Sequence, residues 1–185
     1  MSVHGLYRMD PNNIGDWVCS PLDYFDFGVS TRSDIYLNWN GKADLVVIGG
    51  GGVFPAWSSK IRPHARRGVV WGAGSNLSPS DPRSLYPLWL KEFRLVGVRD
   101  WGCGHQWAPC ASCMSPLFDR QYAVRHSVVS YMHKDRPSPV HPGLCLTNAC
   151  TDFEAVVNFL GSAETVVTNT YHGVYWRHCW GARWS

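Results

Sequence analysis

Two glycine-rich segments have the clearest chemical potential in this sequence. Gly49 to Gly52 follow the apolar run Asp44–Ile48, and Gly72 and Gly74 follow the run Gly68–Trp71. Glycine lets a ligand approach backbone N–H groups closely, and such groups at the carboxyl ends of parallel strands bind anions. Neither segment has the third glycine of a dinucleotide-binding loop or the lysine of a P-loop. We therefore expect a pocket lined by backbone, with purely structural glycines as the alternative.

Three polar positions could add side-chain chemistry to these loops. His172 lies in Thr168–Gly173, directly after a predicted buried strand, where an imidazole could act as acid and base near neutral pH. Asp16 closes the segment Asn13–Asp16 and could either contact a ligand or cap a following helix. Arg99 follows another strand and could bind an anion or pair with Asp100 on the surface. For His172 the alternative is a buried histidine with a structural role.

Cysteine spacing gives a weaker signal. Cys110 and Cys113 form a Cys-x-x-Cys pair, with Cys103 and His105 upstream. No second pair follows at zinc-finger spacing, and the pair does not open a helix after a strand as in thioredoxin-like redox sites. Seven cysteines spread over the chain are expected to be reduced thiols, several of them buried under a loop. The sequence predicts no metal and no cofactor.

The elements that must position these residues follow an α/β pattern. Apolar runs that end in glycine or polar loops indicate a Rossmann-like parallel sheet flanked by helices. Thr151 and Glu154 form a possible capping box for one of the helices. The turn-rich segment 102–125 predicts a boundary, and the part after it has too few strands for an independent sheet. The expected strands are 44–48, 68–71, 94–98, 127–132 and 164–168, and the expected helices are 85–93 and 153–160.

Composition excludes several classes of protein. The chain has 185 residues, a net charge of +3 and 45% hydrophobic residues, so it can form a hydrophobic core. Its length corresponds to one domain and part of a second. No long apolar run and no signal-peptide pattern is present, which predicts a cytoplasmic protein without a membrane span. Arg62, Arg66 and Arg67 with His64 are the densest basic stretch, and we interpret it as a solvated face. Nucleic acid is therefore not an expected partner.

The order of several segments resembles the polysaccharide pyruvyl transferase family, and the resemblance extends to Trp176. The segments are Pro11–Asp16, Asp44–Phe54, Val70–Asn76, Leu95–Asp100, Trp107–Asp119 and Thr168–Gly173. The family implies a two-domain, GT-B-like architecture with two Rossmann-like halves, here with an incomplete second domain. It also implies transfer of a pyruvyl group from phosphoenolpyruvate to a sugar hydroxyl of a surface polysaccharide.

The resemblance also implies roles for individual residues. His172 becomes the candidate catalytic acid and base. The family often has Arg-Leu-His where Thr170, Tyr171 and His172 stand here, so Arg99 becomes the alternative cation for the anionic donor. The expected substrate-binding residues are Asn13, Gly15, Asp16, Gly49, Gly50, Gly51, Gly52, Gly72, Gly74, Asn76, Arg99, Thr168, Asn169 and Thr170. A sugar-nucleotide glycosyltransferase and a non-catalytic remnant are the alternative functions.

The last residues depart from the family pattern. We expect an N-terminal domain over 1–120, a partial second domain over 121–176 and an out-of-frame tail over 177–185. Back-translation of the tail with one G restored encodes Ala-Thr-Leu-Leu-Gly-Arg-Lys-Val-Val, which continues the family pattern. Sequencing the DNA across codon 176 tests this hypothesis, because an uninterrupted frame without such a continuation contradicts it.

Overall fold

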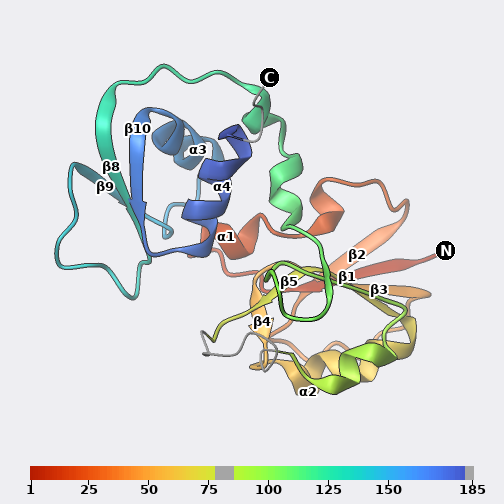
Figure 1. Ribbon diagram of the computed structural model, residues 1–185. Coiled ribbons are helices and arrows are strands. Elements are labelled where there is room, and N and C mark those ends of the chain that lie inside the picture. The colour runs from red at the N-terminus through yellow and green to blue at the C-terminus, as the bar shows by residue number, and fades with distance from the viewer. Residues whose placement is uncertain (78–85, 182–185) are drawn as a thin grey trace. The chain divides into compact units, whose positions relative to one another are not determined.

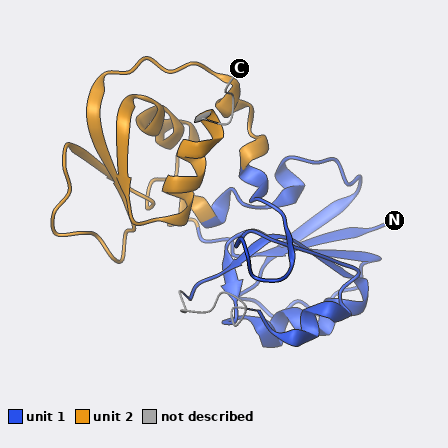
Figure 2. Cartoon of the chain, viewed as in Figure 1, with its two compact units in different colours: residues 1–10, 16–112 blue, residues 11–15, 113–185 orange. Residues whose placement is uncertain are grey.

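The chain folds into two compact units, coloured separately in Figure 2. The structure is a computed structural model that describes residues 1–77 and 86–181. Unit 1 comprises residues 1–10 and 16–112, and unit 2 comprises residues 11–15 and 113–185. The contacts thus divide the chain after Ser112, whereas the sequence analysis expected a division after residue 120.

Unit 1 contains a parallel sheet with strand order β2-β1-β3-β5-β6-β7, and β4 pairs with β5 (Figure 1). The expected α/β class with a mostly parallel sheet flanked by helices is confirmed and is compatible with a Rossmann-like fold. Strands β1, β2, β4 and β7 were not expected. The bounds are β1 Val3–Tyr7, β2 Ser30–Asp34, β3 Leu45–Gly49, β4 Gly52–Phe54, β5 Gly68–Ser75, β6 Leu95–Val98 and β7 Gln106–Trp107.

Short helices complete unit 1. The core forms where apolar side chains of the sheet, such as Ile48 and Val70, pack against Ile61 and Leu90. The helix expected over 85–93 is a 3-10 helix over Leu88–Glu92, and Leu85 lies outside the described residues. The helices are α2 Ser58–Ile61 and the 3-10 helices η1 Pro21–Asp23, η2 Arg62–Arg67 and η4 Leu88–Glu92. Helix α1 Ile14–Trp17 and the 3-10 helix η5 Ala111–Met114 contain residues of both units.

Unit 2 has a parallel sheet of order β10-β8-β9, and α3 and α4 both contact β10 (Figure 1). Strand β9 was not expected, because its short run follows a loop rich in proline and histidine. The capping-box prediction is wrong at its first residue: the carboxylate of Asp152, not the hydroxyl of Thr151, caps α3 by accepting from Ala155 N at 3.0 Å. The elements are η6 Pro116–Asp119, β8 His126–Met132, β9 Leu144–Thr147, α3 Phe153–Gly161, β10 Ala163–Thr168 and α4 Tyr171–Gly181.

Residues after Trp176 continue helix α4 up to Gly181. The Arg177 guanidinium donates to the carbonyls of Ala163 and Glu164 at 3.2 and 3.1 Å. The Trp180 ring packs edge-on against Phe118 with centroids 5.2 Å apart. Residues 182–185 lie outside the described residues, and the out-of-frame origin of 177–185 stays a hypothesis. Within the described ranges, no helix has the length and apolar character needed to cross a membrane.

Candidate functional site

The sheet of unit 1 changes its winding direction between β1 and β3. The chain goes from β1 outward to β2 on one side, and from β3 to β5 and β6 on the other. Open α/β sheets bind ligands at the carboxyl ends of strands where the strand order reverses in this way. Arg8 follows β1 directly, and the loop Gly49–Gly52 follows β3. The topology therefore places a cation and the predicted glycine loop at the expected ligand position.

Two side chains approach this glycine loop at successive residues. A Cβ atom at Gly51 would lie 3.1 Å from Asp16 Oδ1, and one at Gly52 would lie 3.4 Å from Arg99 Nη2. A Cβ atom at Gly74 would lie only 2.0 Å from Arg99 Nε. Gly51 also has a φ of +69°, a conformation that favours glycine. The glycines of the two loops thus make room for a carboxylate and a guanidinium at one edge of the sheet.

The environment of Asp16 alters its acidity. Burial raises the pKa of Asp16 to about 6; the Arg99 charge opposes this rise, Asp10 adds to it, and Arg8 opposes it. The residue as a whole keeps an intermediate exposed fraction. A carboxyl group with a pKa near 6 exists in both protonation states around neutral pH, which suits a general acid and base.

Arg8 and Arg99 place cations near this carboxyl group. Arg8 forms ion pairs with Asp34 and, at 3.5 Å, with Asp10. Arg99 is buried, with 8% of its surface exposed. A surface ion pair with Asp100, the alternative expected from the sequence, therefore does not fit this buried residue. Asp100 accepts hydrogen bonds from Ser75 N at 2.8 Å and from Tyr86 Oη. Asp100 therefore holds the end of strand β5 in place.

The sequence analysis missed Arg8 and Asp34 as members of this site. Both residues occur where a strand ends, which is the signal that pointed to Gly49 and Arg99. Strands β1 and β2 were not predicted, so the positions of Arg8 and Asp34 at strand ends could not be recognised. An expected strand over 3–7 would have placed Arg8 at the same sheet edge as Arg99.

Other glycines on the predicted site list are explained by packing. A Cβ atom would lie 2.3 Å from Pro21 Cδ at Gly49, 2.2 Å from Cys19 Sγ at Gly50 and 2.7 Å from the Pro109 carbonyl oxygen at Gly72. These three glycines accommodate neighbouring chain segments. Asn76 is exposed, and its Cβ atom lies 3.3 Å from the position of a Cβ atom at Gly52. Asn76 is thus the predicted residue nearest to the Gly52 end of the site.

His172, the predicted catalytic residue, lies in unit 2. It is buried with 8% exposure, and its ring packs against Trp176 at 4.8 Å and Tyr171 at 5.1 Å between centroids. A Cβ atom at Gly15 would lie 2.3 Å from His172 Nδ1. The structure therefore brings the predicted residues Gly15 and His172 into direct contact, far apart as they are in sequence.

Thr168, the last residue of β10, and Thr170 precede helix α4. Thr170 Oγ1 accepts from Gly173 N at 2.9 Å, and Thr168 Oγ1 accepts from Thr170 N at 3.1 Å. A Cβ atom at Gly173 would lie 2.3 Å from Thr168 Oγ1. The two hydroxyls and the glycine of this segment hence form a helix N-cap that fixes the backbone beside His172.

Two asparagine side chains hold the loop that follows β8. Asn169 Oδ1 accepts from His133 N at 2.8 Å, and Asn148 Oδ1 accepts from Lys134 N at 2.7 Å. Asn148 Nδ2 also donates to Asn13 Oδ1 at 3.0 Å. Asn13 and Asn169, both predicted to bind substrate, thus have structural partners at the carboxyl edge of the unit 2 sheet.

The cysteines present no metal centre among residues 1–77 and 86–181, where no group of three or more His, Cys, Asp or Glu side chains could hold an ion. All seven cysteines are thiols outside any disulfide. Cys19 and Cys110 are fully buried, and burial raises the pKa of the Cys19 thiol well above its ordinary value. The Cys110 thiol lies 3.2 Å from Ser112 Oγ. Cys19 and Cys110 are therefore structural thiols.

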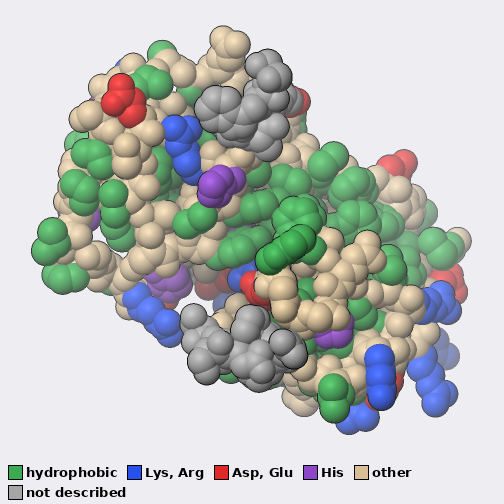
Figure 3. Space-filling model, in the orientation of Figure 1, with side chains coloured by type: hydrophobic (Ala, Val, Ile, Leu, Met, Phe, Trp, Pro, Cys, Tyr) green, Lys and Arg blue, Asp and Glu red, His purple; other side chains and the backbone are tan. Residues whose placement is uncertain are grey.

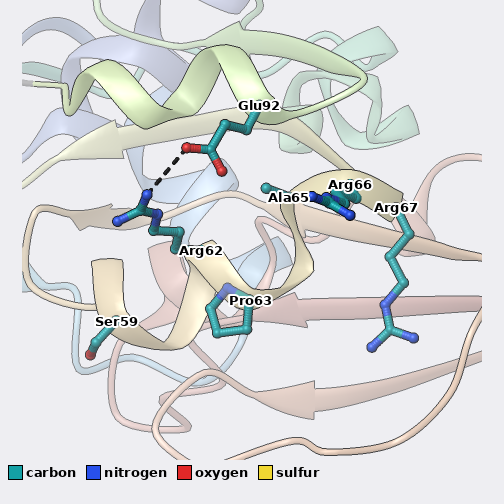
Figure 4. A pocket seen from close by; sticks show the side chains of 7 residues that line it. All are labelled: Ser59, Arg62, Pro63, Ala65, Arg66, Arg67 and Glu92. Atoms are coloured by element: carbon teal, nitrogen blue, oxygen red, sulfur yellow. Dashed lines mark hydrogen bonds and ion pairs between the residues drawn. The ribbon is translucent and has the colours of Figure 1, made fainter.

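The basic stretch of η2 lines a separate cavity of about 510 Å³ in unit 1 (Figure 4). Figure 3 shows Lys and Arg side chains gathered on this end of the unit. Arg62 pairs with Glu92 at 3.3 Å, and Arg67 donates to the Gly41 carbonyl at 3.2 Å, so the two guanidinium groups point apart. His64 is buried, contrary to the expected solvated face. The cavity therefore lacks convergent cations.

No protein-family model matches the chain, and comparisons with curated proteins and with solved structures give no match.

Proposed function

We propose that the chain is a polysaccharide pyruvyl transferase that binds the anionic donor phosphoenolpyruvate at the carboxyl edge of the unit 1 sheet. The observation that carries the proposal is the approach of Asp16 and Arg99 to successive glycines of one loop. Phosphoenolpyruvate has a carboxylate and a phosphate, which need cationic side chains and backbone N–H donors. Arg99 supplies the cation, and the loop would supply backbone contacts at Gly51 and Gly52, because Gly50 N already donates to the Trp71 carbonyl at 3.2 Å.

The reaction needs a group that both gives and accepts a proton. In ketal formation, two sugar hydroxyls add to the C2 carbon of the donor and phosphate leaves. One hydroxyl proton ends on the former methylene carbon, which becomes a methyl group, and the other leaves with phosphate. A carboxyl group with a pKa of about 6 can donate the first proton and regain one from a hydroxyl. We assign this role to Asp16 and keep His172 as the second candidate acid and base.

The two parallel-sheet units support a finer architecture as part of the proposal. Each unit has a topological reversal at the carboxyl edge of its sheet, between β1 and β3 and between β8 and β10. This arrangement fits two Rossmann-like halves of the GT-B-like type, with the second half shorter. We place the reaction in the cytoplasm, with phosphoenolpyruvate as the donor substrate and a saccharide as the acceptor substrate.

A thermal-shift titration of the full chain tests the donor. Phosphoenolpyruvate at a hundred times its Kd should stabilise the fold by about 2.7 kcal/mol. Arg99→Gln should abolish the shift. Arg62→Gln removes an exposed arginine of the same unit and should retain the shift. Absence of a shift in the natural chain, or an equal shift with Arg99→Gln, contradicts the proposal. A shift with uridine diphosphate glucose alone would instead favour the glycosyltransferase alternative.

A further inference from the structure

Two tryptophans are exposed after β6, Trp101 on the loop between β6 and β7 and Trp107 at the end of β7. Trp101 is 80% exposed and Trp107 is 48% exposed, with ring centroids 5.9 Å apart and an interplanar angle of 75°. In Figure 1 this loop is drawn in green, next to the sheet of unit 1. Large aromatic side chains bury much apolar surface when they contact a partner, so a pair left exposed on a folded unit indicates a binding surface.

The loop is held against the proposed donor site. Trp107 Nε1 donates to the Arg99 carbonyl at 3.0 Å, and Cys103 Sγ donates to the Asp100 carbonyl at 3.0 Å. The Tyr86 ring packs edge-on against His105 with centroids 5.5 Å apart, and its hydroxyl donates to Asp100. The indole pair is therefore fixed relative to Arg99, which reduces the ordering cost of binding.

The surroundings of the pair select an uncharged ligand. Between Asp100 and Asp119 the sequence contains no Lys, Arg, Asp or Glu. A nucleic acid would need several cations for its phosphates, and this segment supplies none. Burial lowers the pKa of His105, which leaves its imidazole neutral, and Gln106 is also uncharged. An exposed indole face on a chain segment without charged side chains matches a sugar ring, which has an apolar C–H face and hydroxyls at its edge.

We propose that Trp101 and Trp107 form the subsite that binds the saccharide acceptor, with one sugar ring lying against the indole of Trp101. This inference rests on the proposed function, because the bond from Trp107 to the Arg99 backbone ties the subsite to the donor site. Trp107 sets the position of the subsite, and Trp101 supplies the larger exposed surface. The proposal concerns neutral pyranosides and leaves phosphate recognition to Arg99.

Ligand-observed NMR and calorimetry on the full chain test the subsite. The probes are methyl β-glycosides of glucose, galactose and mannose, and at least one should bind, with its ring C–H signals shifted upfield by the indole. Trp101→Ala should weaken that binding by about two- to tenfold or more, the range expected for loss of an aromatic contact. Leu88→Ala, which removes another highly exposed apolar side chain of unit 1, should leave it unchanged.

Phosphoenolpyruvate binding is measured on the same samples to separate the two proposals. Trp101→Ala should keep the donor-induced thermal shift, since its side chain is exposed and is not part of the donor contacts. If none of the glycosides binds the natural chain, or if Trp101→Ala binds them unchanged, the subsite proposal is wrong even where the donor binds. If a glycoside binds through Trp101 but phosphoenolpyruvate does not bind, the subsite stands and the proposed function fails.

Discussion

Asp16 and Arg99 occupy the space that side chains would need at two successive glycines, with Asp16 Oδ1 3.1 Å from a Cβ position at Gly51 and Arg99 Nη2 3.4 Å from one at Gly52. The carboxylate and guanidinium come from segments far apart in sequence, so the loop between β3 and β4 brings them together. Glycine is favoured at Gly51 by its φ of +69° as well as by Asp16, whereas a Cβ atom at Gly52 would make an ordinary contact with Arg99. A ligand that meets the loop would meet both charges.

Gly74→Ala should damage the donor site through Arg99. The added Cβ atom would lie 2.0 Å from Arg99 Nε, so the buried guanidinium must move. We expect a stability loss of about 1–3 kcal/mol, as for overpacked cores, and loss of the phosphoenolpyruvate thermal shift. Gly28→Ala is the control, because Gly28 has a positive φ but no atom within 4 Å of its Cβ position. Normal donor binding by Gly74→Ala would show that the Arg99 position is unimportant.

Asp16→Asn should stabilise the fold at neutral pH and remove transfer activity. The folded pKa of about 6 exceeds the ordinary 3.8, so the carboxylate opposes folding once the pH rises through 6 and has no effect below about 4. Removing the charge should raise the free energy of unfolding by about 1–2 kcal/mol at pH 7, after allowance for solvent screening. Urea unfolding at pH 4 and pH 7 measures this difference. If the stability difference between Asp16→Asn and the natural chain is the same at pH 4 and pH 7, the raised pKa of Asp16 is wrong. If the variant remains active, Asp16 is not the acid and base.

His4 should make the fold sensitive to acid. Burial, followed by the charges of His64 and Arg67, lowers the pKa of His4 to about 4. Both ring nitrogens contact hydroxyls at 2.8 Å, and the ring stacks on Trp39. The unfolded chain binds a proton near pH 6.5, so stability should fall as the pH decreases from 6.5 to 4.

The acid sensitivity is best measured in the Asp16→Asn background, because Asp16 has the opposite pH dependence between 4 and 6. In that background, His4→Gln should flatten the curve of unfolding free energy against pH. An unchanged slope would mean that other groups, such as His64 with its lowered pKa, cause the dependence.

His172→Gln tests the catalytic assignment made from sequence. If His172 transfers a proton, kcat should fall by about a hundredfold or more, with KM for the donor little changed. Gly15→Ala should produce a similar loss without touching the imidazole chemically, since its Cβ atom would lie 2.3 Å from His172 Nδ1. Full activity of His172→Gln would leave Asp16 as the acid and base.

Substitutions of Thr170 show whether its hydroxyl caps helix α4 or binds substrate. Its hydroxyl caps α4 through Gly173 N, so Thr170→Ala should cost about 1 kcal/mol of stability and Thr170→Ser should restore it. Thermal unfolding measures both variants. If Thr170→Ala instead changes only the KM for the saccharide at unchanged stability, the hydroxyl binds substrate.

The sequence predicted the strands whose apolar runs end at glycine or polar residues, and it missed strands without that contrast. Val46 to Ile48 form a buried strand of the expected kind, and Val129 lies in another. Strand β1 contains His4 and Gly5, which interrupt an apolar pattern. Strand β2 consists of polar residues, Ser30 to Asp34, and lies at the sheet edge, where no burial shapes its composition.

The candidate site was predicted in its parts but not in its grouping. Asp16, Arg99 and the glycine loop were all named from sequence, but their proximity depends on strand order, which periodicity does not determine. The raised pKa of Asp16 depends on Arg99, Asp10 and Arg8 converging from different segments. The contact between Gly15 and His172 likewise joins opposite ends of the chain.

The segment Pro11–Gly15 packs with unit 2 although the residues on both sides of it belong to unit 1. Its partners in unit 2 include Asn148, whose carbonyl accepts from Ile14 N at 2.9 Å. During synthesis, this segment leaves the ribosome long before Asn148 is translated. If unit 1 folds during synthesis, this segment lacks its Asn148 partner until the rest of unit 2 has been translated. A nascent chain halted after residue 112 should recruit chaperones at this stretch.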